Sequence, residues 1–337
     1  MGKEIVNRTI WISAEEHIHL PAVAIEKDMW VTCILQILFS MDIDAHIIFK
    51  GGTSLSKFGN LIERFSEDID IAIDPAVYGL DGDLTKKQLK TLRKLSSLFV
   101  KEVMAPALQE ALNKYHLMDR LSIEVEPEGE GDATYPEPRR IFIKYPSLIR
   151  EKYSYIKNEV VLEVGSRSLM EPTVALNIQS LIEKQFPAIS ASLVNTTIVT
   201  AAPAKTFVEK ACLLHELFST ERESIAANRR SRHLYDLERL MDLDFAKQAM
   251  IDDALWKSIQ HHRAVFTSMK DVNYSVDFRK HLVLCPPAHV LPAWEEDYRQ
   301  MCETMIFGEK LPFGSLLNRI KELEDRFPKF DIFCRFL

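Results

Sequence analysis

Two short stretches of this chain hold residues whose types and spacing could do chemistry. The first places Gly51, Gly52, Thr53 and Ser54 directly after an apolar run, and the second, residues 68–71, alternates acidic and apolar side chains. Because side chains alternate along a strand, Asp68 and Asp70 should project from one face. Two such carboxylates repel each other unless a cation lies between them, and a pair of magnesium ions is one known arrangement. The second stretch therefore indicates a metal site.

The glycine turn could supply the other half of such a site. Glycine lets the backbone approach a ligand closely, and we expect Thr53 or Ser54 to cap the helix that follows. The first turn of a helix offers N–H groups and the positive end of the helix dipole to a phosphate. Taken alone, the glycine stretch could be an ordinary turn, and the acidic stretch could be a strand face exposed to solvent. Together they are typical of phosphoryl or nucleotidyl transfer.

The composition bounds the class of protein. The chain has 337 residues, 47% hydrophobic and 27% charged, as in a soluble globular protein of one large or two ordinary domains. A net charge of −7 argues against a protein coated in basic surface, although a local basic groove remains compatible with it. The apolar runs are too short to cross a bilayer, so we expect a cytoplasmic protein without a membrane span.

The cysteines are scattered and include no C-x-x-C pair. They are Cys33, Cys212, Cys285, Cys302 and Cys334. This pattern favours free buried thiols in a reducing compartment over a disulfide framework.

Hydrophobic periodicity changes near residue 200. Before that point we expect strands at 47–50, 69–73, 121–125, 140–145 and 159–164, and helices beginning near Ser13, Pro21 and Thr85. Pro106 should kink or break the third helix, and residues 187–200 should be irregular. Beyond residue 200 we expect helices at 205–218, 231–241, 254–269, 293–306 and 313–326.

Gly51–Leu55 and Arg64–Asp70 resemble the AbiEii/AbiGii toxin family of nucleotidyltransferases. These belong to the polymerase-beta-like superfamily, whose first motif joins a Gly-Gly or Gly-Ser turn to Asp-x-Asp. The resemblance covers most of the chain. It implies an α+β fold, with a polymerase-beta-like nucleotidyltransferase lobe of mixed sheet over residues 1–200, an α-helical lobe over 201–337, and the site between them. It further implies that Asp68 and Asp70 hold Mg²⁺ and that the glycine turn holds phosphates.

The superfamily places a third acidic residue on the strand beside Asp-x-Asp. Glu163 matches this position best, where it would complete the metal site or act as a base, and Glu159 is the alternative. A strand glutamate that simply faces water is the structural reading of the same pattern.

Two motifs beyond residue 200 extend the resemblance to AbiEii-like and MenT-like toxins. These toxins carry a helical lysine and then an Arg-Asp-x-Tyr-Asp-Leu run, which Lys210 and residues 232–237 match. His233 departs from the pattern, where aspartate is often found. Lys210 would offset triphosphate charge, and Asp236 would keep it charged and oriented. Without the family match, a lysine on a helix is most simply a solvent-facing cation.

A compact basic cluster precedes Asp236 and could hold an RNA backbone. It consists of Arg229, Arg230 and Arg232. A solvated loop at the start of a helix is an equally good reading.

The resemblance implies a toxin of a type IV toxin–antitoxin or phage-defence pair. It would transfer NMP from an NTP to an RNA acceptor, the 3′ end of tRNA, and would have an antitoxin as its protein partner. Transfer to a protein or a small molecule is an alternative. A catalytically degenerate module that binds nucleotides or partners is another, and the intact Asp68, Asp70, Lys210 and Asp236 argue against it.

Overall fold

The computed structural model describes residues 8–41, 43, 47–59, 61–149, 156–188, 194, 196–219 and 225–328. The chain divides into two compact units, one formed by Met1–Asn60 and Arg64–Ala201 and the other by Leu61–Glu63 and Ala202–Leu337. The short segment before Arg64 joins the second unit because the backbone oxygen of Glu63 accepts hydrogen bonds from the amides of Phe307 and Gly308, at 3.0 and 3.2 Å.

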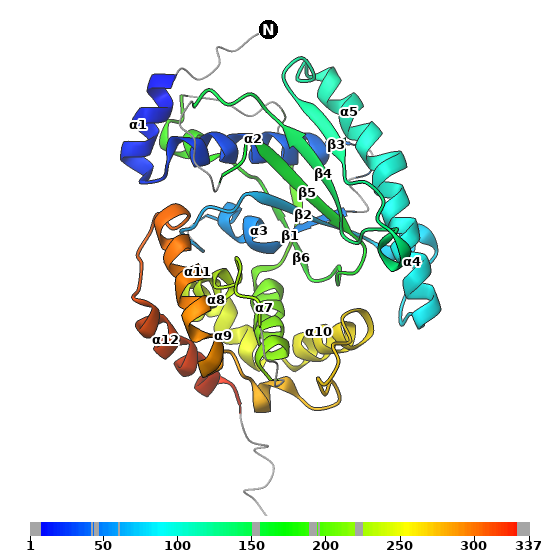
Figure 1. Ribbon diagram of the computed structural model, residues 1–337, viewed down its shortest axis with the longest axis vertical. Coiled ribbons are helices and arrows are strands. Elements are labelled where there is room, and N and C mark those ends of the chain that lie inside the picture. Colours follow the sequence, from blue (N-terminus) through cyan, green and yellow to red (C-terminus); the bar gives the residue numbers. More distant parts are fainter. Residues whose placement is uncertain are drawn as a thin grey trace, which may run out of the picture. The chain divides into compact units, whose positions relative to one another are not determined.

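The first unit is built on a seven-stranded sheet with the order β3-β4-β5-β2-β1-β7-β6 (Figure 1). Its strands are β1 (Ile47–Lys50), β2 (Asp68–Ile73), β3 (Ser122–Val125), β4 (Arg139–Lys144), β5 (Glu159–Gly165), β6 (Thr173–Leu176) and β7 (Ile198–Ala201). β2 pairs with β5 and β1 with β7 in parallel, whereas the other neighbouring strands are antiparallel. The expected α+β fold with a mixed sheet is confirmed.

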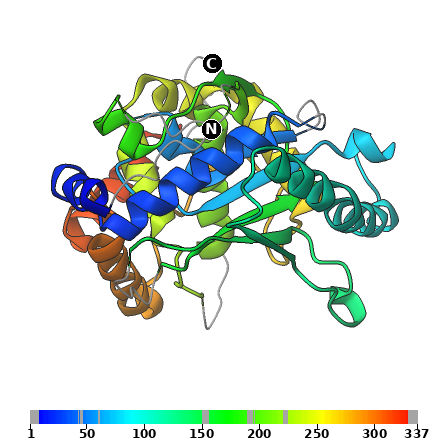
Figure 2. The same ribbon diagram turned by 90° about the horizontal axis from the view of Figure 1, so that it is seen from above.

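The helices of this unit are α1 (Arg8–Ile18), α2 (Ala22–Leu38), α3 (Gly51–Lys57), α4 (Lys86–Phe99), α5 (Ala105–Lys114) and α6 (Leu181–Gln185). The main core lies where α2 and α5 meet one face of the sheet (Figure 2). There the helices pack against the apolar sides of β2 and β5, which are Ile69, Ile71, Ile73, Val160, Leu162 and Val164. The alternation predicted for both strands is therefore confirmed.

The long helix behaves as its proline predicted. Thr85 accepts a hydrogen bond from the Gln88 amide and forms a complete capping box at the start of α4. A π-helical turn, Val100–Met104, separates α4 from α5 directly before Pro106. Because proline lacks an N–H and its ring crowds the preceding turn, a widened turn accommodates it.

Two local predictions are wrong. α1 begins at Arg8, so Ser13 lies inside the helix and does not start it. Residues 198–201 form β7, next to β1 with Phe49 opposite Thr200, where irregular chain was expected. A strand of only four residues takes its order from its neighbours in the sheet, which a local pattern does not reveal.

The second unit is helical, as expected from the periodicity. Its helices are α7 (Pro203–Phe218), α8 (Arg232–Leu240), α9 (Asp244–Ile251), α10 (Asp253–Phe266), α11 (Leu291–Thr304) and α12 (Phe313–Arg326). Only α9 was not predicted. Asp252 alone separates it from α10, which it caps by accepting a hydrogen bond from the Leu255 amide. Within the described part of the chain, no helix combines the length and apolar composition needed to cross a membrane.

Candidate functional site

Three carboxylates lie side by side on one face of the sheet. In β2, Ile69 is fully buried, whereas Asp68 and Asp70 are half-buried on the opposite face. The register of the parallel pair β2–β5 sets Glu163 opposite Asp70. Glu159 belongs to the same strand but lies two residues before Val161, the partner of Asp68. Of the two glutamates weighed from the sequence, Glu163 is the one beside the aspartates.

The electrostatics of this face reflect the crowding of like charges. Burial raises the pKa of Glu163, and the nearby charges of Asp70 and Asp68 raise it further. Arg140 and Lys50 act in the opposite direction and more weakly. The strand register explains both cations, since it sets Lys50 opposite Asp70 and Arg140 opposite Glu163. Two acids therefore occupy the middle of a row of four charged residues that crosses four strands.

The glycine turn faces Asp70 directly. Gly51 has φ +78°, a conformation that favours glycine, and a Cβ atom built on it would lie 2.0 Å from Oδ2 of Asp70. No side chain fits there without displacing the carboxylate. The present position of the Asp70 carboxylate beside this turn thus depends on glycine at position 51.

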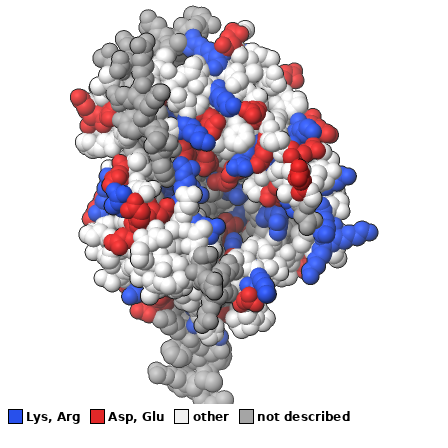
Figure 3. All heavy atoms as spheres, in the orientation of Figure 1, with Lys and Arg blue, Asp and Glu red and all other residues white. Residues whose placement is uncertain are grey.

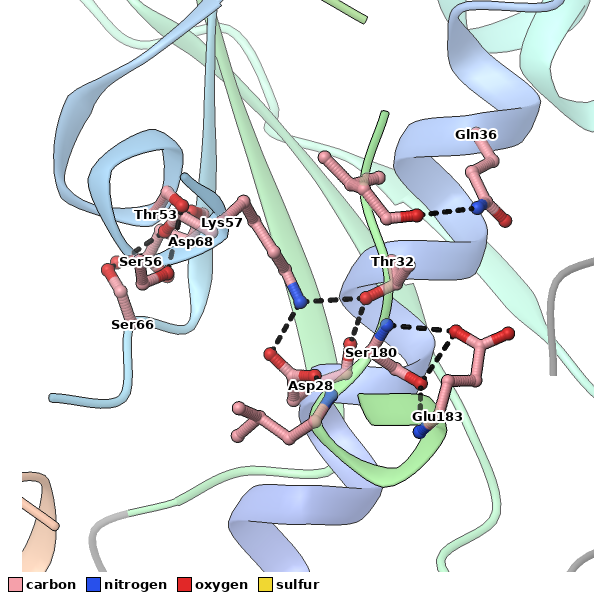
Figure 4. Close-up of polar contacts among 12 residues, drawn as sticks. Asp28, Thr32, Gln36, Thr53, Ser56, Lys57, Ser66, Asp68, Ser180 and Glu183 are labelled. Carbon is pink, nitrogen blue, oxygen red and sulfur yellow. Dashed lines mark hydrogen bonds and ion pairs between the residues drawn. The ribbon is translucent and has the colours of Figure 1, made fainter. Parts of the chain in front are cut away.

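Thr53 and Ser54 have partners within the fold. α3 begins at Gly51 with Lys50 as its N-cap residue, so the expectation that Thr53 or Ser54 caps the helix is wrong. Thr53 Oγ1 donates to the backbone oxygen of Asp68 and lies 2.8 Å from Ser66 Oγ (Figure 4). Ser54 Oγ donates to the Gly51 carbonyl at 2.8 Å. The Thr53 hydroxyl therefore ties α3 to the start of β2, whereas the Ser54 hydroxyl is bonded within α3 itself.

The donor set of this face suits a hard divalent cation. Mg²⁺ prefers oxygen ligands and is commonly held by one or two carboxylates together with substrate phosphates and water. Asp68 and Asp70 provide such a pair. Among the described residues, no three or more His, Cys, Asp or Glu side chains form a ready-made metal cage. The residues present fit Mg²⁺ to the extent that a pair of carboxylates is the share of its ligands that a protein commonly supplies.

Lys210 and Asp236 form a buried ion pair within the second unit. Lys210 Nζ on α7 lies 2.9 Å from Asp236 Oδ2 on α8, and the two side chains are 8% and 0% exposed. His233 Nδ1 lies 3.5 Å from the same ammonium group. The residue that departs from the family pattern is thus next to Lys210, where it adds a second polar neighbour.

The basic cluster of residues 229–232 is held by an acid from another helix. Asp297 on α11 accepts hydrogen bonds from the Arg229 amide at 2.6 Å and from the amide and hydroxyl of Ser231, at 2.9 and 2.5 Å. Arg229 adopts φ +58°. Because these bonds use main-chain groups and the Ser231 hydroxyl, they fix the loop before α8 without using the guanidinium groups of the cluster. Acidic and basic side chains are interspersed on the face shown in Figure 3.

Sequence reasoning missed a buried ionic network under this site. It gave no role to the helix that begins near Pro21, yet three charged residues of α2, Glu26, Lys27 and Asp28, are buried. Lys27 Nζ lies 2.6 Å from Glu67, and Lys57 Nζ lies 2.6 Å from Asp28. The available signal was three consecutive charged residues in a helix that is otherwise apolar on nearly every side.

The described cysteines are free and carry no sign of reactivity. Cys33 and Cys212 are buried, and Cys285 and Cys302 are half-buried. Burial raises the pKa of the Cys33, Cys212 and Cys285 thiols to about 12, which keeps them protonated at neutral pH. Cys334 lies outside the described residues.

Comparisons with known proteins place these features in context. The family model of the nucleotidyl transferase AbiEii toxins of type IV toxin–antitoxin systems matches residues 35–331. None of the curated proteins compared with the chain matches it. Among solved structures, the chain is similar to MenT4, a nucleotidyltransferase toxin from Mycobacterium tuberculosis H37Rv, with 16% identity, a TM-score of 0.57, and coverage of 96% of this chain and 90% of that one. JHP933 from Helicobacter pylori matches at 14% identity, with coverage of 91% and 98% and a TM-score of 0.38.

Proposed function

Because the chain belongs to the AbiEii family of nucleotidyltransferase toxins, as its motifs predicted, we propose that it transfers NMP from an NTP to RNA. The acceptor in this proposal is the 3′ end of tRNA. The observation that carries the proposal is the cluster of Asp68, Asp70 and Glu163 on adjacent strands, with Asp70 against the Gly51 turn. Like charges gathered beside a glycine turn are suited to a substrate that brings both phosphates and a cation.

The reaction needs a hydroxyl oxygen to attack the α-phosphorus in line with the leaving group. The bond to the β-phosphate oxygen breaks, pyrophosphate leaves, and the hydroxyl proton passes to a base. Asp68 and Asp70 would hold Mg²⁺, which when bound stabilises the attacking and leaving oxygens. Glu163 is suited to take the proton, because its pKa is raised by burial and by the neighbouring aspartates. The backbone of Gly51 and Gly52, and the amides of Thr53 and Ser54, would bind phosphate oxygens.

Residues of the helical unit complete the proposed machinery. Lys210 would offset triphosphate charge, and the contact with Asp236 would keep it protonated and oriented. Arg229, Arg230 and Arg232 would contact RNA phosphates, a role supported by the fixed loop that carries them. A cognate antitoxin and a cytoplasmic location, where NTPs and tRNA are found, belong to the same proposal.

The decisive experiment incubates the protein with each of the four α-labelled NTPs, Mg²⁺, and separate pools of tRNA, other RNA and protein. We expect label in tRNA, which sequencing of the tRNA 3′ ends should locate. Asp68→Ala should abolish this incorporation, whereas Glu124→Gln, on the exposed edge strand β3, should retain it. Incorporation retained by Asp68→Ala would refute the metal assignment.

The same experiment separates the alternatives. Label that enters only the protein pool or small molecules would replace RNA as the acceptor. No transfer in any pool, with NTP binding intact, would favour a degenerate nucleotide-binding module. Chelation of divalent metal before the reaction should remove all transfer if the proposal is right.

A further inference from the structure

Helix α2 buries three consecutive charged residues. Glu26, Lys27 and Asp28 are 1%, 2% and 5% exposed. They precede the segment 35–331 that the AbiEii family model matches. Burying charge costs free energy, and a buried ion pair is often no more stable than well-packed apolar side chains of similar volume. Stability alone is therefore a weak explanation for this run, which makes the partners of each charge informative.

Lys27 holds the residue that directly precedes the metal-binding aspartates. Its Nζ lies 2.6 Å from Glu67 Oε2, and the two side chains are 2% and 7% exposed. Glu67 is bonded through the backbone to Asp68, the first residue of β2. A fixed Glu67 side chain limits how the backbone can rotate as it enters that strand. The position of the Asp68 carboxylate consequently depends on Lys27.

Asp28 holds the helix that follows the glycine turn. Its Oδ1 lies 2.6 Å from Lys57 Nζ, which also donates to Thr32 Oγ1 at 2.8 Å (Figure 4). Lys57 is the last residue of α3, and Thr53, one turn earlier in α3, donates to the backbone oxygen of Asp68. The second oxygen of Asp28 accepts from the Leu181 amide at 2.7 Å. Both oxygens of this buried carboxylate are thus satisfied.

The two ion pairs start from adjacent residues and reach the two halves of the site. One leads from α2 to the start of β2, and the other leads to the end of α3. Between them, the hydrogen bond from Thr53 to the Asp68 backbone closes the connection. Side chains that contact and orient the ligands of a metal, without touching the metal themselves, commonly determine how tightly the metal binds.

We propose that Lys27 and Asp28 are positioning residues. Through Glu67 and Lys57 they hold Asp68, Asp70 and the glycine turn in the geometry that binds a divalent cation. The proposal rests on the proposed function for its activity readout, but metal binding and backbone protection of residues 66–70 test it without any turnover.

The main test replaces one buried pair by apolar side chains of similar length, in the full chain. In Lys27→Met with Glu67→Met, both members of the ion pair are replaced together, so the variant should fold and melt near the wild type. The matched control is Lys101→Met with Glu128→Met, a pair at 2.8 Å whose side chains are 46% and 41% exposed. The probe is Mn²⁺, whose binding is followed by electron paramagnetic resonance. Hydrogen exchange of residues 66–70, and kcat and KM for NTP incorporation, complete the set.

We expect the buried double variant to bind Mn²⁺ about 10- to 100-fold more weakly and to lose kcat by a similar factor. Amides of residues 66–70 should exchange faster, while KM for NTP changes much less. The exposed control should match the wild type in every measurement. A buried double variant that melts, exchanges, binds Mn²⁺ and turns over like the wild type would overturn the proposal.

A second variant keeps the test decisive if the double variant does not fold. Asp28→Asn removes one charge with almost no change in volume and should give the same losses on a smaller scale. If Asp28→Asn is folded and unchanged in Mn²⁺ binding and in exchange, the positioning role is refuted. If the wild type itself transfers no NMP, the proposed function fails, whereas Mn²⁺ binding and exchange still decide the role of Lys27 and Asp28.

Discussion

The sheet unit and the helical unit place charge in opposite ways. On the sheet, Asp70 and Glu163 are half-buried neighbours of the same sign, and their mutual repulsion contributes to the raised pKa of Glu163. In the helical unit, Lys210 and Asp236 are nearly fully buried, of opposite sign, and 2.9 Å apart. In the sheet unit, the two acids are direct neighbours with no cationic side chain between them. In the helical unit, each charge has an opposite charge beside it.

This difference separates function from stability. Where like charges are neighbours, removing one charge relieves repulsion, so the substitution should harm chemistry but not folding. A buried ion pair holds opposite charges together, so removing one member takes away the nearest counter-charge of the other in the interior. Substitutions in both units test this contrast.

The largest effect should come from Asp70→Asn. We expect NMP transfer to fall about 1,000-fold, because a proposed metal ligand is lost beside the reacting phosphate. Without divalent metal, the melting temperature at neutral pH should not fall, since Asn relieves repulsion with Glu163. Calorimetry with and without Mg²⁺, beside a transfer assay, measures both quantities. A large drop in metal-free stability would remove the contrast between the two units.

Lys210→Met should destabilise the helical unit by about 3–5 kcal/mol, because Asp236 is then buried without its cation. Hydrogen exchange of α7 and α8 reports this unit separately, as calorimetry of a two-unit chain need not be two-state. Lys210→Met combined with Asp236→Leu should recover most of the stability.

Variants of Lys210 and Asp236 also show whether toxicity depends on chemistry or on folding. Expression of the wild type should slow growth, and Lys210→Ala should relieve it. If the stable double variant is also harmless, the pair formed by Lys210 and Asp236 acts in the chemistry. Toxicity restored by the double variant would show that relief came from unfolding alone.

His215 should make the helical unit sensitive to acid. Burial lowers its pKa to about 4, and its Nδ1 accepts a hydrogen bond from the Val283 amide, as a neutral imidazole does. The unfolded chain takes up this proton near pH 6.5, so stability should fall as the pH drops from 6.5 towards 4, by about 2 kcal/mol at pH 5. His215→Asn should lose this dependence, which unfolding at a series of pH values measures. An unchanged acid limb in that variant would contradict the assignment.

Glu163→Gln should give the smallest effect on stability, with the opposite pH trend. A raised pKa means that the folded state disfavours the carboxylate, so the stability gained from protonation is lost as the pH rises from the ordinary glutamate range through the folded pKa. Gln should therefore raise the melting temperature slightly at neutral pH and leave it unchanged in acid.

Transfer activity gives a second view of Glu163. In the wild type, activity should rise as the pH passes upward through the raised pKa of Glu163, because the carboxylate form is the proposed base. Glu163→Gln should lack this limb of the profile. If activity of the variant still rises over the same pH range, the base is another group.

Predictions from local sequence patterns were reliable where the structure depends only on residues within one strand or one helical turn. Alternation in residues 68–73 and 159–164 predicted which side chains face the core, and the core contains the expected ones. Thr85 and Pro106 marked a helix start and a disruption, because capping and a missing N–H act within one turn. The same local reasoning failed for Thr53, whose hydroxyl is bonded to Asp68 backbone from a distant part of the chain.

The amino-acid sequence alone determined the family, the α+β class and the identity of the candidate acids, because motif spacing and periodicity are properties of neighbouring residues. Tertiary structure alone decided that Glu163 rather than Glu159 stands opposite Asp70, that Lys27 pairs with Glu67, and that Asp28 pairs with Lys57. Those relations join segments up to about a hundred residues apart, and strand register and helix packing set them through contacts that no local pattern contains.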